Sequence, residues 1–577
     1  MSDFALKDAP MNTTTQTRAK RVYATDLAAR GEPMVFAMGG SLAIGLLMIV
    51  GILGLIAWFG FTTFWPQPIA VVTSKDGKVI AGEVFRSESF KPADAQLAAV
   101  PPESRQQIED DLGYAERTLY RVGNYDLYGE DFQWRNAYDV SSVEYPADLT
   151  FIERQEWGPF VGRITQLSLN GTVTENPPLD AVLAAVSDGQ ARRAEIRRLK
   201  SEEIGRVSTE IEELRLEAKA AVIDYGATDE RAVAKQAEVA EQTKALQASY
   251  DELSAKLQAL EAEDAKYAMT LADIGGQTKS QPLSTIVRLY RPNDMGFFAK
   301  LSVYGGRWGE FIFSEPREAN TEGGVWPAIV GTLAMTVLLS LLVAPFGVMT
   351  ALYLREYARQ GRLVSFVRIC VNNLAGVPSI VYGVFGLGFF CYVLGGSIDQ
   401  IFFPERLPSP TFGTGGVLWS ALTLALLTVP VVIVATEEAL AAVPRSMREG
   451  SLACGASKWQ TIRWIVLPRA LPGIMTGLIL AMARGAGEVA PLMLVGVVKL
   501  APELPVDLTW PFIHLDRSFM HLGFHIYDVG FQSRNAEAGR PMVYVTTLLL
   551  IAIILVLNAA AISVRNRLKR RFAGSQF

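Results

Sequence analysis

Six long apolar segments constrain the fold of this chain more than any other feature. A transmembrane helix needs about 20 predominantly apolar residues, and each segment reaches that length. The sequence therefore predicts an α-helical membrane protein with six transmembrane helices, at approximately Phe36–Phe61, Trp326–Leu354, Ile369–Gly396, Gly415–Ala435, Ala470–Val498 and Pro541–Val564.

The composition indicates that the spans are joined to a large soluble part. Hydrophobic residues make up 50% and charged residues 20% of the 577 residues, and the mean hydropathy is +0.21, which is less apolar than a pure helix bundle. The net charge of -5 gives no indication of nucleic-acid binding. The three cysteines lie in or between the C-terminal spans, so a disulfide framework in the soluble part is excluded.

Lysine and arginine gather beside four span ends and predict the topology. Such clusters stay on the cytoplasmic side, and all four agree only when both termini lie inside. The first span is too long for a signal-peptide core, so we expect a retained anchor. The predicted order is a cytoplasmic segment (1–35), the first span (36–63), an outside insert (64–324), a five-span core (325–565) with an inside loop (437–469), and a basic cytoplasmic tail (566–577).

The outside insert contains heptad patterning. Apolar residues recur at steps of three and four from Val207 to Ala221, and again from Leu246 to Leu271, with Asp264 at one core position. A turn signal at 224–229 separates the two runs and predicts an antiparallel coiled-coil hairpin over about 183–271. The alternative is that these helices pack into a globular domain. Before them, residues 67–166 mix β-branched and aromatic runs with Pro and Gly, which predicts a small α+β region.

A polar stretch between the fourth and fifth spans predicts two short helices joined at a glycine. It begins Glu449-Gly450-Ser451 and reaches Gly455, and an Ile-x-Leu-Pro sequence follows. A soluble partner can bind a helix-turn-helix on the membrane surface and move it. The spacing of these residues resembles the coupling loop of bacterial ABC importer permeases. The alternative is an ordinary amphipathic connector. The residues predicted to couple to an ATPase are Glu449, Gly450, Ser451, Gly455, Ile465, Leu467 and Pro468.

The fifth apolar segment contains a cation and an anion four residues apart, Arg484 and Glu488. On a helix they would share one face. Charges at membrane depth usually face the interior of a bundle or a water-filled path. One interpretation is an ion pair that locks helices together, and the other is an anion pathway in which Arg484 attracts an oxyanion.

Gly376 and Pro378 interrupt the third apolar segment. Broken helices at membrane depth occur where they line a cavity or are buried in protein. Ser379, directly after the break, is therefore a third candidate for the substrate pathway. The alternative is a proline kink that only shapes the bundle.

The sequence does not predict a nucleotide or metal site in this chain. The chain has no P-loop motif, so ATP and Mg would be bound by a partner ATPase and the chain itself would be no enzyme. A metal-binding cysteine cluster is absent as well. His514, His521 and His525 all fall before the last span, where an amphipathic gate loop is favoured over a metal site.

Four segments together resemble the PstA family of phosphate ABC importer permeases: Ala375–Gly383, Glu437–Leu440, Arg448–Pro468 and Arg484–Leu492. The resemblance covers about residues 325–565. It implies a type I importer core in the bacterial inner membrane, with the insert in the periplasm. The implied partners are the homologous permease PstC, two copies of the ATPase PstB, the periplasmic phosphate-binding protein PstS and membrane lipid.

The chain departs from that family at two places. Val489 stands where relatives commonly carry threonine, and the compact members have only a short connection in place of the insert. The function that the resemblance implies is the import of inorganic phosphate, driven by ATP. The alternatives are a permease for another tetrahedral oxyanion, such as sulfate or molybdate, and a membrane-anchored coiled-coil scaffold or sensor.

Overall fold

The structure is a computed structural model that describes residues 33–93, 100, 102–110, 112–533 and 536–573. The contacts divide the chain into two units, residues 1–56 and 57–577. In the described part of the first unit, the chain forms most of α1 (Pro33–Thr62). Nearly all of the predicted cytoplasmic segment 1–35, including the basic residues before the first span, lies outside the described residues, as does the end of the basic tail.

Six helical segments of the described chain are long and apolar enough to cross a membrane, which confirms the predicted number. Their bounds are Met34–Thr62, Trp326–Tyr357, Ser379–Phe402, Val417–Ala441, Lys458–Gly487 and Glu537–Arg570. Three predicted bounds differ by ten residues or more. The third span begins at Ser379 rather than Ile369, and the fifth runs from Lys458 to Gly487 rather than from Ala470 to Val498.

Helix breaks explain the start of the third span and the end of the fifth. An amphipathic helix, α10 (Arg362–Leu374), occupies the start of the third apolar segment, and α11 (Ser379–Phe385) begins only after Pro378. Proline disfavours helical geometry at the residue before it, and Val377 precedes it here. The fifth span stops at Gly487, where a short irregular segment leads to α17 (Leu492–Val495).

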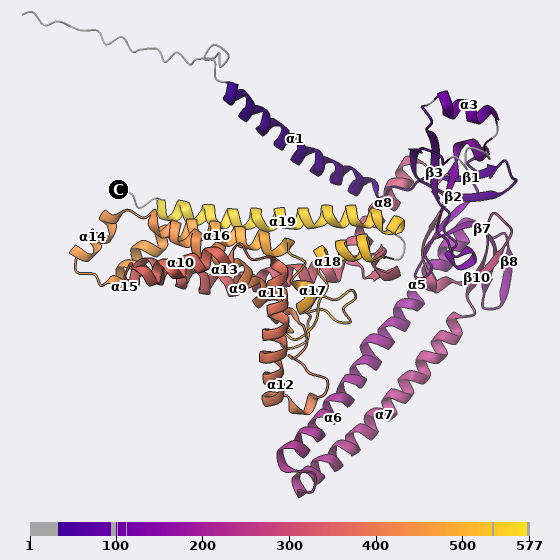
Figure 1. The fold of residues 1–577 in the computed structure, drawn as a ribbon. Helices are drawn as coiled ribbons and strands as arrows, with labels where there is room; N and C mark the ends of the chain where they lie inside the picture. Colours follow the sequence, from indigo (N-terminus) through magenta and orange to yellow (C-terminus); the bar gives the residue numbers. More distant parts are fainter. Residues whose placement is uncertain (1–32, 94–99, 101, 111, 534–535, 574–577) are drawn as a thin grey trace, which may run out of the picture. The chain divides into compact units, whose positions relative to one another are not determined.

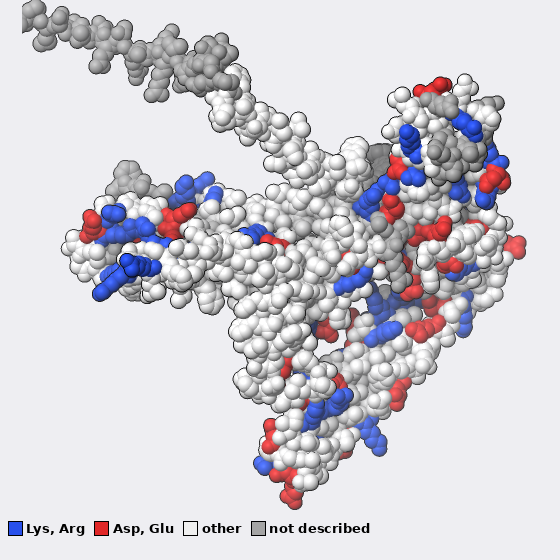
Figure 2. All heavy atoms as spheres, viewed as in Figure 1, with Lys and Arg blue, Asp and Glu red and all other residues white. Residues whose placement is uncertain are grey.

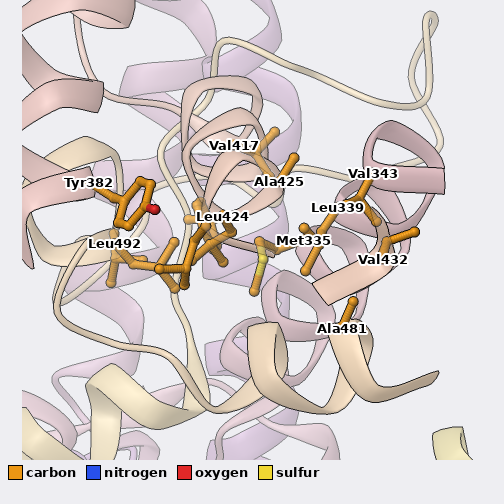
Figure 3. Close-up of a cluster of buried hydrophobic side chains, with 13 residues drawn as sticks. Met335, Leu339, Val343, Tyr382, Val417, Leu424, Ala425, Val432, Ala481 and Leu492 are labelled. Atoms are coloured by element: carbon orange, nitrogen blue, oxygen red, sulfur yellow. The ribbon is translucent and has the colours of Figure 1, made fainter. Parts of the chain in front are cut away.

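The core of the spanning part is built around α13 (Val417–Ala441). In its most apolar window 67% of the residues are buried, compared with 11% in α19 (Ala536–Ala573). Side chains from α9 (Trp326–Leu352), α11, α16 (Leu467–Gly487) and α17 pack against it, as Figure 3 shows for Leu339, Tyr382 and Leu492. Figure 2 shows few charges along these helices, whereas charged side chains gather over α14 (Arg445–Ala453), α15 (Lys458–Thr461) and the insert.

The insert contains two antiparallel sheets, so the predicted α+β region is confirmed and is richer in strands than expected. The first sheet has the order β4-β3-β2-β1-β5 and the second β10-β9-β7-β6-β11, with β8 paired to β7 (Figure 1). Their strands are β1 (Ile69–Ser74), β2 (Val79–Phe90), β3 (Ala115–Arg121), β4 (Phe132–Asn136), β5 (Val140–Glu144), β6 (Thr150–Arg154), β7 (Phe160–Leu169), β8 (Thr172–Glu175), β9 (Ala268–Ala272), β10 (Thr278–Pro282) and β11 (Ile286–Tyr290).

A long helical hairpin emerges from the second sheet. One arm runs through α5 (Leu179–Arg198), a π-helical stretch (Leu199–Ile204) and α6 (Gly205–Tyr225), and the other is α7 (Glu230–Asp264). Figure 1 shows α6 and α7 side by side. Asp229 caps α7 through a hydrogen bond from the Arg231 amide, which confirms the predicted turn.

The predicted end of the hairpin was wrong. Tyr267 lies beyond α7, and Leu271 belongs to β9. Asp264 is instead the last residue of α7 and is buried at the base of the hairpin. Its carboxylate pairs with Arg192 at 3.0 Å and accepts a hydrogen bond from the Ser284 hydroxyl, so it ties both arms to the sheet.

One helix and a small two-stranded ribbon join the insert to the spans. Helix α8 (Phe297–Phe313) follows the second sheet, and two short strands, β12 (Pro316–Arg317) and β13 (Glu322–Gly323), form a small ribbon before α9. Buried residues of α8 and α9 then form one cluster with residues of α19, including Phe311, Ile329 and Met542. This cluster connects the base of the insert to the spanning helices.

Candidate functional site

The candidate coupling segment forms the predicted helix-turn-helix. Helix α14 ends at Ala453, and Gly455 has a φ of +84°, a conformation that favours glycine. The Gly455 amide donates to the Leu452 carbonyl at 3.0 Å, and the Ala456 amide donates to the Ser451 carbonyl at 3.2 Å. This is the hydrogen-bond pattern of a Schellman cap, which turns the chain sharply at the end of a helix.

The second helix of the coupling segment begins with a capping box. The Ser457 hydroxyl accepts from the Gln460 amide, and the Gln460 side chain accepts from the Ser457 amide. From Lys458 the helix continues through a π-helical stretch (Ile462–Val466) into α16, with Pro468 in its first turn. The surface helix is therefore continuous with a membrane span.

The predicted coupling residues divide into an exposed and a packed group. Glu449 and Gly450 are exposed on α14. Leu467 packs in a buried cluster with Leu440 and Val466, at the junction of α13 and α16. A cavity of about 630 Å³ beside the segment is lined in part by Gly450, Ser451, Ile465 and Pro468.

Arg448 holds this segment against two spans, a role that the sequence did not reveal. Its guanidinium donates to the carbonyls of Leu440 and Val443, at the end of α13, at 2.6 and 2.8 Å. It also pairs with Glu356, at the end of the second span, at 3.0 Å. Its position within the coupling motif was the only available signal.

Arg484 and Glu488 form an ion pair at 3.4 Å, with 36% and 21% of their side chains exposed. The expectation that both lie on one helix was wrong, because α16 ends at Gly487 and Glu488 has an extended backbone (φ -78°, ψ 134°). The pair therefore spans a helix end. A Cβ at Gly487 would meet no atom within 4 Å, so there is open space beside the pair.

The two breaks in the membrane helices lie together. A Cβ at Gly383, in α11, would come within 2.7 Å of the Pro491 Cα, directly before α17. Tyr382 is buried beside this contact, donates to the Leu374 carbonyl at 2.7 Å and lies within the electrostatic reach of Arg484. Ser379 is half-buried one turn before Tyr382, and in the described part of the chain it forms no side-chain hydrogen bond with Arg484 or Glu488.

Two of the three histidines in the segment predicted as an amphipathic gate loop are buried. His521 and His525 are buried at the start of and within α18 (Leu522–Tyr527), and burial lowers the pKa of each to about 4. The Nδ1 of His521 accepts from the Gly523 amide at 3.1 Å, which makes it a helix cap. Among the described residues, no group of three or more potential ligands could hold a metal ion.

Comparisons with known proteins place the spanning part in one family. The family described as "Binding-protein-dependent transport system inner membrane component" matches residues 343–574. The probable ABC transporter permease protein YqgH of Bacillus subtilis is 35% identical over 204 residues, which are 34% of this chain and 62% of that protein. This chain therefore spans less than two thirds of YqgH.

A second relative is matched over more of its length. The phosphate transport system permease protein PstA 1 of Mycobacterium tuberculosis is 36% identical over 250 residues, which are 43% of this chain and 73% of that protein. Among solved structures, the inward-facing MetNI methionine ABC transporter gives a TM-score of 0.31 at 19% identity, over 42% of this chain and 97% of that one. On the sequence matches, the chain belongs to the family of binding-protein-dependent transport system inner membrane components, in the group that contains PstA.

Proposed function

We propose that this chain is the permease subunit of an ATP-driven ABC importer for inorganic phosphate. The observation that carries the proposal is the match to a relative named as a phosphate transport permease. The family match over residues 343–574 contains every predicted site residue. The charged pair at the break after α16 agrees with it, because a phosphate ion needs a cation where it crosses the membrane.

Arg484 is the residue that we assign to the substrate. Its side chain is partly exposed, and among the described residues it forms one ion pair, with Glu488 at 3.4 Å, a single contact that an oxyanion can replace. Glu488 then orients the free guanidinium or accepts a proton-bearing phosphate oxygen. Ser379 supplies a hydroxyl near the second break. The competing role is a structural lock between the end of α16 and the following segment.

The coupling segment transmits force from a partner ATPase. ATP and Mg are bound by that partner, and Glu449 and Gly450 lie on the exposed face that it would contact. Since Arg448 ties this segment to the ends of the second and fourth spans, a push on α14 moves those spans. The proposed complex contains the homologous permease PstC, two copies of PstB and the binding protein PstS.

The topology follows from the basic clusters. Both termini would be cytoplasmic in the bacterial inner membrane, and the insert would lie in the periplasm. The helical hairpin would then be a docking or spacing element for a periplasmic partner, and the chain would itself have no enzymatic activity.

Uptake of labelled anions tests the proposal. Cells that lack their own phosphate importers and express this chain with its co-purifying subunits should accumulate labelled phosphate, and a tenfold excess of unlabelled sulfate or molybdate should not compete. Efficient competition by sulfate or molybdate would assign the chain to another oxyanion. If no ATPase co-purifies and no anion accumulates, the chain is a scaffold or sensor.

A further inference from the structure

A second cavity, of about 630 Å³, lies at the base of the insert. Its volume is within the roughly 300–1,000 Å³ typical of ligand sites. Part of its wall comes from the ends of two spans, where the rings of Phe59 in α1 and Tyr544 in α19 stack with centroids 5.0 Å apart. The remaining wall comes largely from β2 and from charged residues of the insert.

Most of the charged side chains in the cavity wall form ion pairs with one another. Arg121 pairs with Glu322 and Arg317 pairs with Glu310, at 2.5 and 2.7 Å. Arg307 pairs with Glu153, and the Tyr290 hydroxyl is within hydrogen-bond distance of its guanidinium. In this cluster each cation already has a carboxylate partner.

Glu83 is the exception within the described residues. This β2 residue lines the cavity, is only 9% exposed, and forms no side-chain hydrogen bond or ion pair with another described residue. It lies opposite Arg121 in the strand ladder, but that guanidinium is bound to Glu322. Burial raises the pKa of Glu83, Arg307 and Arg121 act against this, and Glu153 and Glu322 add to it. The Glu83 carboxylate faces the cavity without a donor, so the site favours a ligand that brings one.

Two guanidinium groups at the edge of the cavity keep part of their surface exposed. Arg86 and Arg540 both line the cavity and both pair with Glu537, at 2.9 and 3.6 Å, and Arg86 also pairs with Glu88 at 3.6 Å. Their side chains remain 32% and 48% exposed. Guanidinium groups arranged in this way suit the oxygens of a phosphodiester.

We propose that this cavity binds the headgroup of a membrane phospholipid with a primary amine, such as phosphatidylethanolamine. The ammonium donates to Glu83, the phosphodiester lies at Arg86 and Arg540, and an acyl chain runs along Phe59 and Tyr544. A lipid is the fitting occupant because these two aromatic residues belong to membrane-span candidates, while the insert supplies the polar wall. A choline headgroup has no N–H to donate and leaves Glu83 unpaired.

Native mass spectrometry of the full chain, purified with its accompanying subunits, tests the proposal. The protein is equilibrated with equal amounts of phosphatidylethanolamine, phosphatidylcholine and phosphatidylglycerol. The expected result is retention of phosphatidylethanolamine over phosphatidylcholine by about tenfold or more, since hydrogen bonds to charged groups are of that strength. Glu83→Gln should abolish this preference. Glu116→Gln, an exposed change on β3 outside the cavity, should leave it intact.

Equal retention of the ethanolamine and choline lipids by the unaltered chain would overturn the proposal, as would a preference that survives in Glu83→Gln. Stronger retention of phosphatidylglycerol would overturn it too. Should Glu83→Gln fail to fold, Arg540→Gln at the exposed edge provides a second variant. It should lower the retention of all three phospholipids alike, and unchanged retention would refute the assigned phosphodiester position.

Discussion

Replacing Gly455 should lower the local stability of the turn in the coupling segment, and the backbone angle of Gly455 determines by how much. A Cβ at this position would meet no atom within 4 Å, so crowding contributes nothing. The cost is purely conformational, because the φ of +84° lies in the left-handed region. For alanine that cost is about 1–2 kcal/mol. Asparagine tolerates this region better, and valine, which is β-branched, tolerates it worst.

Hydrogen exchange at the cap reports this cost directly. The amides of residues 455 and 456 donate the two hydrogen bonds that close the turn. A loss of 1–2 kcal/mol in local stability corresponds to roughly 5–30-fold faster exchange. We therefore expect that range for Gly455→Ala, a smaller increase for Gly455→Asn and a larger one for Gly455→Val. Substrate-stimulated ATP hydrolysis should become uncoupled from uptake in the same order.

Gly450→Ala is the matched control, because Gly450 lies five residues earlier, within α14, and a Cβ there also meets nothing within 4 Å. In a helix this change should stabilise by about 0.5–1 kcal/mol. Equal exchange rates at residues 455 and 456 in all three Gly455 variants, or an equal acceleration of that exchange by Gly450→Ala, would refute the argument from φ.

Three further predictions concern the pathway, the buried histidines and the hairpin. Arg484→Ala should lower phosphate uptake at least about tenfold while the complex still assembles; failed assembly in both Arg484→Ala and Glu488→Gln would instead identify a lock. His521 and His525 have folded pKa values of about 4 against 6.5 unfolded, so below pH 6.5 the unfolded chain binds protons that the folded chain does not. Stability should fall as the pH drops towards 4, by about 2 kcal/mol per histidine at pH 5, and a double His→Gln variant with the same melting profile would contradict this. Replacing residues 205–250 by a short flexible linker should lower uptake mainly at low substrate concentration, whereas unchanged uptake and partners would exclude a role in transport.

The positions of the spans and the break at Pro378 could be predicted because their signals are local, but the break at Gly487 could not. The apolar run across Gly487 continues as far as Val498, and only the structure shows that α16 ends at Gly487. At Pro378 the break itself was predicted, but the sequence did not show that an amphipathic helix precedes it within the same apolar segment. Hydropathy measures how apolar a segment is, but it does not report whether the backbone of that segment forms one continuous helix.

The extent of the hairpin was overestimated for a related reason. Tyr267 and Leu271 are four residues apart, which fits a helix, but four is also a multiple of the two-residue period of a strand. Leu271 packs in the core of the sheet with Met269. The sheet itself could not be predicted, because its pairings join distant residues, such as Phe151 with Tyr290.

The candidate site was predicted residue by residue, but its geometry was not. Spacing alone placed Arg484 and Glu488 together, and the structure pairs them across a helix end. The contribution of Arg448 depends on carbonyl groups at the end of another helix, which no local pattern reveals.

The hairpin starts after β8 and ends before β9, and both strands pair with β7. Its two arms therefore enter and leave the sheet on either side of one strand, and the sheet keeps its register whatever lies between them. Lengthening both arms by a matched number of heptads would change the reach of the hairpin without altering the sheet. The exposed tip at Gly226–Thr228 is likewise a place where a fluorescent reporter can be inserted without interrupting either arm.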